Sequence, residues 1–113
     1  MTAAELTAHY AAELGETITV RRYTGGGTNR PRFDAQCRGK AWGYSATELV
    51  GSIQQGDTRV LVLVQDLIDA QFALPLTPAD KLVVKGREIA VVSPSARKAP
   101  DGTLVVYDIQ ARG

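Results

Sequence analysis

Residues 32–44 form an alternating segment that constrains the fold more than any other part of the chain. Odd positions carry apolar or small residues, and even positions carry mostly charged, polar or aromatic ones. Side chains of a β-strand point alternately to opposite faces, so this pattern predicts a strand with one buried and one wet face. The small residues of the predicted buried face indicate a place where a sheet curls tightly or another element packs closely. That face consists of Phe33, Ala35, Cys37, Gly39, Ala41 and Gly43.

Other segments also have the period of two, or the continuous apolar character, of strands. Residues 60–64 are apolar at every position, which predicts a strand covered on both faces. Turn residues separate the last three segments, at Lys85-Gly86 and at Pro100-Asp101-Gly102. The further predicted strands are residues 17–22, 60–64, 81–84, 87–92 and 103–112.

The N-terminal residues have a helical pattern instead. Thr2 and Glu5 are spaced as a capping box, and Gly15 is placed to end the helix. A helix is therefore predicted over about residues 3–14, and a single helical turn at residues 66–70. The apolar stripe of the first helix consists of Leu6, Tyr10 and Leu14.

Length and element spacing predict one domain over residues 1–113. The chain has 113 residues, 44 % of them hydrophobic, which suffices for one modest core. Short strands joined by tight turns favour antiparallel pairing. We expect a mainly β fold, a small antiparallel barrel or sandwich of about six strands over residues 17–112, with the short helix before it and an extended loop at about 45–57.

Chemically reactive groups are few. With one histidine, His9, and one cysteine, Cys37, the chain offers no intrachain disulfide and no zinc site of the usual ligand count. Cys37 is expected to be a buried, inert thiol. No apolar run approaches the ~20 residues of a membrane helix, no signal-peptide pattern is visible, and a reducing cytoplasm is the simplest site of assembly. We expect a protein that is not an enzyme and has no cofactor, metal or membrane partner.

Two patterns leave catalytic readings formally open. Asp66 and Asp69 are three residues apart and could share a face of a helical turn; solvated helix-end acids are the plainer interpretation. The run Gly25-Gly26-Gly27 lacks the Gly-Lys-Ser/Thr ending of a phosphate-binding loop, and Pro31 and a strand follow it instead of a helix.

Charge is distributed in two blocks although the net charge is only +1. Residues 17–44 contain six bases and one acid, and residues 45–80 contain five acids and one base. These blocks are either two solvated faces or complementary surfaces that meet between copies.

The wet face of the 32–44 segment combines bases with aromatic residues. This combination is typical of single-strand nucleic-acid binding by small barrels. The same residue types are enriched in protein interfaces, so subunit contact is the other interpretation. The basic interface candidates are Arg32, Arg38, Lys40 and Trp42.

The order of motifs resembles that of phage head-closure proteins, the head–tail connector or stopper family. The matching motifs are Glu48-Leu49, Gly51, Gln55-Gly56-Asp57, the apolar run 60–64, Asp66-Leu67, residues 80–87 and the closing segment 105–112. The resemblance covers roughly residues 15–113, and the N-terminal helix is not typical of it.

This resemblance implies a structural subunit of the virion neck, assembled in the host bacterial cytoplasm. It implies a ring of identical subunits, a hexamer or dodecamer, that closes the portal channel and offers a docking surface to the tail. The implied partners are the portal or adaptor protein and the tail terminator or tail tube protein, with DNA only passing through the channel. The interface or channel-loop candidates are Ser45, Glu48, Leu49, Val50, Gly51, Gln54, Gln55 and Asp57.

A closed ring needs two different patches that meet, and the charge blocks offer such a pair. We expect bases of residues 21–40 to face Glu48, Asp57 or Asp66 of the next subunit. Each exposed pair should add only ~0–1 kcal/mol, so buried apolar area must hold a ring together.

Overall fold

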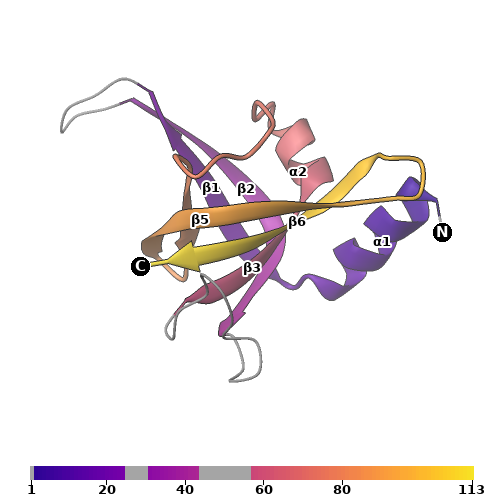
Figure 1. Ribbon diagram of the computed structural model, residues 1–113, viewed down its shortest axis with the longest axis horizontal. Coiled ribbons are helices and arrows are strands. Elements are labelled where there is room, and N and C mark those ends of the chain that lie inside the picture. The colour runs from indigo at the N-terminus through magenta and orange to yellow at the C-terminus, as the bar shows by residue number, and fades with distance from the viewer. Residues whose placement is uncertain (1, 25–30, 44–56) are drawn as a thin grey trace.

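The computed structural model describes residues 2–24, 31–43 and 57–113 (Figure 1). In this part of the chain a helix precedes three strands, a short helix follows, and three more strands complete the fold. The elements are α1 (Ala3–Glu13), β1 (Glu16–Tyr23), β2 (Arg32–Gly43), β3 (Thr58–Leu63), α2 (Val64–Asp69), β4 (Lys81–Val84), β5 (Arg87–Lys98) and β6 (Leu104–Arg112).

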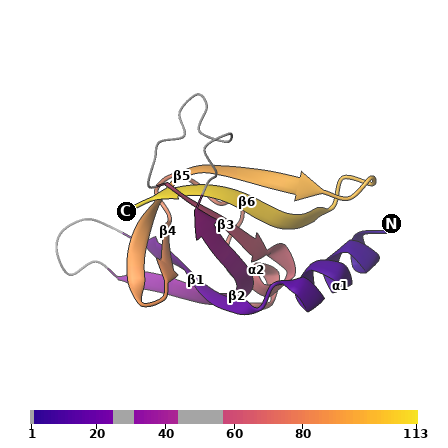
Figure 2. The same ribbon diagram turned by 90° about the horizontal axis from the view of Figure 1, so that it is seen from below.

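The strands close into an antiparallel barrel. Their order around it is β1-β2-β3-β6-β5-β4, and β4 pairs with β1 to complete the circle. Figures 1 and 2 show the strands wrapping around a common interior, with α1 projecting from one end of the long axis. The prediction of a mainly β fold with a short N-terminal helix is confirmed, and of the two predicted architectures the chain adopts the barrel.

Strand β2 changes its pairing partner from β1 to β3 at Gly39. Residues 32–39 pair with β1 and residues 39–43 pair with β3, so Gly39 lies opposite both Glu16 and Val62. A Cβ atom at Gly39 would collide with the backbone oxygen of Leu61 and lie 2.7 Å from the Ile18 Cγ1. The small residues of this segment therefore allow the sheet to turn tightly, as predicted.

Two apolar clusters lie on the two sides of the sheet. Val60 and Val62 of β3 point into the barrel, where Ile18, Leu82 and Ile109 meet them. Leu61 and Leu63 point outward into a second cluster, which Leu14 and partly buried residues of α1 cover. The prediction that this strand is covered on both faces is confirmed.

Helix α1 begins as predicted and ends differently. The Thr2 hydroxyl accepts from the Glu5 N–H, and the Glu5 carboxylate accepts from the Thr2 N–H. The helix ends at Glu13 because Leu14 adopts an extended conformation and buries its side chain in the second cluster. Gly15 is not in the left-handed conformation that a glycine stop uses, so its predicted role was wrong.

Two further predictions need correction. Phe33 and Gly43 were placed on the buried face, but both are exposed, Phe33 to 44 %, because they lie near the two ends of β2; the Phe33 ring centroid is 5.9 Å from that of Phe72. The strand predicted at 87–92 extends to Lys98 through Pro94 and a register shift after Val91. The predicted turns at Lys85-Gly86 and at Gly102 are confirmed by φ angles of 52°, 79° and 89°.

Candidate interaction surfaces

The groups considered for catalysis come from three elements, His9 from α1, Cys37 from β2 and the two aspartates Asp66 and Asp69 from α2. His9 is on α1, where its Nε2 lies 3.4 Å from a Glu13 oxygen. Asp69 of α2 accepts a hydrogen bond from the Gln65 amide at 2.8 Å. Within residues 2–24, 31–43 and 57–113, no three His, Cys, Asp or Glu side chains gather as a metal ion would require.

Cys37 lies inside the barrel, on the inward face of β2. Its side chain is buried, and burial raises the pKa of its thiol to about 12, with a smaller contribution from Asp66. A thiolate is the nucleophilic form of cysteine, so this environment suppresses reactivity.

Asp66 binds Arg38 of the same chain. The carboxylate accepts the Arg38 backbone N–H at 2.7 Å and two guanidinium N–H groups at 2.9 and 3.1 Å. Hydrogen bonds from Arg38 hold the pKa of Asp66 below its usual value, against the opposing effect of burial. Arg38, a predicted interface base, thus joins β2 to α2.

Asp57, the residue directly before β3, has a buried side chain that is hydrogen-bonded to β6. Its side chain accepts hydrogen bonds from the Gln110 amide at 2.9 Å and from the Arg112 guanidinium at 2.8 and 3.0 Å, and the residue is 4 % exposed. Its predicted place in an extended interface loop is therefore corrected, because these bonds fasten it to β6. The other loop candidates lie outside the described residues: Ser45, Glu48, Leu49, Val50, Gly51, Gln54 and Gln55.

The hypothesis that bases of residues 21–40 reach the carboxylates of a neighbour is corrected for Asp57 and Asp66. Both are bonded within the chain, as above. Arg22 likewise binds Asp80, which is 1 % exposed, at 2.7 Å, and its guanidinium lies over the Phe72 ring. Two ion pairs join the charge blocks inside one molecule, Arg22 with Asp80 and Arg38 with Asp66. Arg21 pairs instead with Asp34 and Glu88, and Asp57 pairs with Arg112.

The remaining basic candidates lie on the outer wall. Arg32 is 55 % exposed, and its Nε lies 3.7 Å from an Asp34 oxygen. Trp42 is partly buried against the second cluster; the Arg59 guanidinium lies 5.0 Å and the Lys40 ammonium 5.9 Å from its ring centroid. Trp42 therefore packs as part of the wall, with cations beside it.

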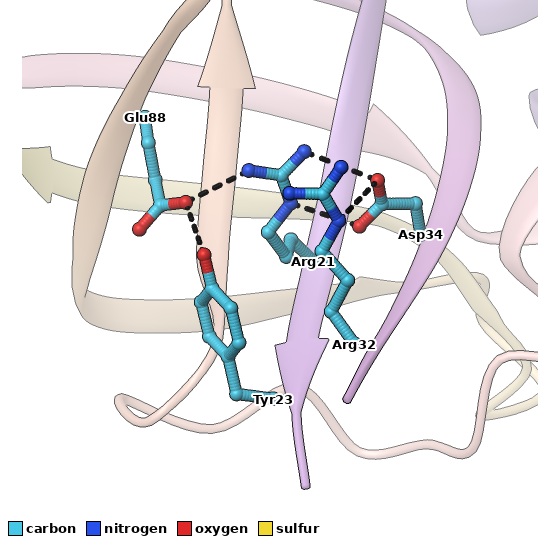
Figure 3. Close-up of polar contacts among 5 residues, drawn as sticks. All are labelled: Arg21, Tyr23, Arg32, Asp34 and Glu88. Carbon is cyan, nitrogen blue, oxygen red and sulfur yellow. Dashed lines mark hydrogen bonds and ion pairs between the residues drawn. The ribbon is translucent and has the colours of Figure 1, made fainter. Parts of the chain in front are cut away.

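A five-residue polar network crosses β1, β2 and β5 (Figure 3). Arg21 donates to Asp34 at 2.9 and 3.1 Å and to Glu88 at 2.8 Å, and the Tyr23 hydroxyl donates to Glu88 at 2.6 Å. Arg21 lowers the pKa of Asp34, and Tyr23 and then Arg21 lower that of Glu88. Sequence reasoning missed this network because Glu88 is 67 residues from Arg21 and only strand register brings them together.

An open groove of about 430 Å³ separates α1 from α2 and the β5–β6 turn. Ile68 of α2, 53 % exposed, lines it. Small residues of α1, among them Ala4, Ala8 and Ala11, form the opposite wall, with Leu104 nearby. Among described residues, Phe33 and Ile68 are the large hydrophobic side chains that remain exposed.

Comparison with known proteins places the chain in no family: neither the protein-family models nor the curated proteins searched gave a match. In the part of the chain that the structure describes, no helix is long and apolar enough to cross a membrane.

Proposed function

We propose that the chain is a non-enzymatic structural subunit of the head–tail connector of a tailed phage or prophage. In this role it joins a ring of identical subunits below the portal, closes the channel after DNA packaging and offers a surface to the tail. The proposal starts from the ordered motifs at 48–57, 80–87 and 105–112. A compact closed barrel is compatible with it.

One observation on the described part of the chain carries the proposal: charged side chains pair within the molecule, and large apolar side chains remain exposed at two places. Ion pairs within the chain hold its elements together: Arg38–Asp66 at 2.9 Å joins β2 to α2, and Arg59–Asp108 at 2.8 Å joins β3 to β6. What is left exposed and apolar is Phe33 at the end of β2 and Ile68 beside the groove. Two separate apolar spots on a rigid wall suit a subunit that touches other protein copies.

A phage carrying a stop codon in this gene tests the proposal. We expect filled heads and complete tails that fail to join, and heads that leak DNA, with both defects corrected by supplying the chain from a plasmid. Immunogold labelling should place the chain at the neck of wild-type virions. Normal virions without the chain would overturn the proposal.

A second candidate function, single-strand nucleic-acid binding, is favoured by one observation. Trp42 has Lys40 and Arg59 beside its ring on the outer wall. Opposing it, Trp42 already packs against the second cluster, and Asp108 neutralises part of the charge of Arg59. Tight binding of an oligonucleotide that weakens steeply with salt, and that Trp42→Ala abolishes, would favour this function instead.

A further inference from the structure

We infer that α1 is exchanged between copies of this chain, so that in the assembled form it covers the outer face of β3 and β6 of a neighbouring copy. The inference deepens the proposed function and rests on it, because it names the contact through which ring neighbours would join. The outer face consists of Leu61 and Leu63 of β3 and Val106 of β6.

This outer face requires an apolar cover. Leu61 is 8 % exposed and Leu63 and Val106 are fully buried, although all three belong to the cluster outside the barrel. Helix α1 contacts β3 and β6 and supplies the cover through partly buried residues such as Leu6 and Tyr10. Because every copy carries the same helix, α1 of a second copy fits this face as well as the chain's own helix does.

Helix α1 is attached to the barrel by this apolar contact. None of its residues is fully buried. The hydrogen bonds and the ion pair that its side chains form with described residues stay within the helix and its cap, between Thr2 and Glu5 and between His9 and Glu13. The helix can therefore leave its own barrel without breaking one of these polar contacts, and it recovers the same apolar contact on a neighbour.

The connection between α1 and β1 is short. The helix ends at Glu13 and β1 begins at Glu16, so only Leu14 and Gly15 lie between them. Leu14 has an extended backbone, with φ −82° and ψ 99°, and a Cβ atom at Gly15 would meet nothing within 4 Å. A loop of two residues has little freedom to relax, and short hinge loops invite exchange between copies.

Exchange of α1 suits a ring because the donated and the receiving patches differ. Each copy would give its helix to the next copy and receive one from the previous copy, which is a heterologous contact. When the circle closes, every helix has a barrel and every outer face has a helix. In Figures 1 and 2, α1 lies at one end of the long axis, where a neighbouring copy can reach it.

Cross-linking of the full-length chain tests the exchange. Ala8 of α1 and Thr103, directly before β6, line the same groove, so the variant with Ala8→Cys and Thr103→Cys carries one thiol on each side of it. At the highest soluble concentration, we expect a short bis-maleimide to join these thiols between chains and to give a ladder of covalent oligomers. A helix that stays on its own barrel gives only a bridged monomer. The unsubstituted chain controls for Cys37, which is buried.

Hinge length provides the matched control. Insertion of Gly-Ser-Gly-Ser after Gly15 should return α1 to its own barrel and lower the ratio of ladder to bridged monomer about tenfold. Bridged monomer alone at the natural hinge length, or a ladder that the insertion leaves unchanged, overturns the exchange. A product that stops at two chains means reciprocal exchange and overturns the ring arrangement.

The stop-codon phage separates this inference from the proposed function. If the ladder is absent and the phage still fails to join heads to tails, the proposed function stands and the exchange is overturned. If the ladder forms and the phage makes normal virions, the proposed function and its ring are overturned.

Discussion

The carboxylate of Asp66 takes the place of a strand partner for Arg38. Pairing between β2 and β3 ends at Gly39↔Val62, and the chain then turns into α2. On the β3 side, the next backbone N–H along β2, that of Arg38, has no strand partner, and Asp66 accepts it at 2.7 Å. On the other side, Arg38 lies opposite Thr17 of β1. Glu16 does the same past the end of β1, where its carboxylate accepts the Ala41 N–H at 3.1 Å. Side-chain carboxylates thus complete the backbone hydrogen bonding of β2 at this corner of the barrel.

Asp66→Ala should destabilise the fold by ~1–3 kcal/mol, because it leaves the Arg38 N–H and guanidinium without their acceptor. The matched control is Asp69→Ala in the same helix, whose carboxylate accepts an exposed hydrogen bond from the Gln65 amide. That change should stay within about 0.5 kcal/mol. Urea unfolding followed by circular dichroism measures both, and equal losses for the two variants would contradict the role assigned to Asp66.

Stability should decrease as the pH falls into the acid range. Hydrogen bonds from Arg38, Arg21 and Tyr23 hold the pKa values of Asp66, Asp34 and Glu88 below their ordinary values of 3.8 for aspartate and 4.5 for glutamate. The unfolded chain therefore binds more protons than the folded chain in this interval, and the stabilisation is lost as pH falls through the lowered values.

We expect these three groups to leave the free energy of unfolding, measured in urea at a series of pH values, unchanged above about pH 6. The free energy of unfolding should then decrease once the pH is lower than the ordinary pKa values of the carboxyl groups. Asp66→Asn should reduce the slope, since it removes one of the groups that titrate. A free energy that stayed level down to pH 3 would argue against these pKa shifts.

Gly39→Ala should cost ~1–3 kcal/mol or more, because the added Cβ would meet the Leu61 carbonyl oxygen, which belongs to the backbone and cannot move aside. Gly43→Ala, four residues along the same strand, is the matched control. A Cβ there meets nothing within 4 Å, and alanine suits a strand better than glycine, so its effect should be ~0–1 kcal/mol in the stabilising direction. Thermal melts of both variants make the comparison, and a mild Gly39→Ala would show that the barrel can relax at this pivot.

Cys37 should resist thiol reagents until the barrel unfolds. With its pKa raised to about 12, roughly one thiol in ten thousand is ionised at pH 8, and the side chain is covered as well. Maleimide labelling followed by mass spectrometry across a urea series should rise with the unfolding transition and not before it. Rapid labelling in native buffer would mean that the barrel opens locally at β2.

The elements that could be predicted are those whose signal is local. The Thr2–Glu5 capping box, the alternation of residues 32–44 and the apolar run at 60–64 each reflect a rule that acts over a few residues. The second half of β5 was not predicted, because Pro94 interrupts the usual strand pattern. The register shift near Pro94 depends on the pairing of β5 with β6, which the sequence pattern does not give.

Composition and periodicity by themselves determined that this chain forms a mainly β domain with a short helix and that Cys37 faces inward, because side-chain burial in a strand follows a period of two. Only the tertiary structure decided between barrel and sandwich, and which charges pair. The partners Arg38–Asp66, Arg21–Glu88 and Arg112–Asp57 are 28, 67 and 55 residues apart. Closure of the barrel, through β4 against β1, brings Glu88 to Arg21, and no spacing in the sequence encodes that distance.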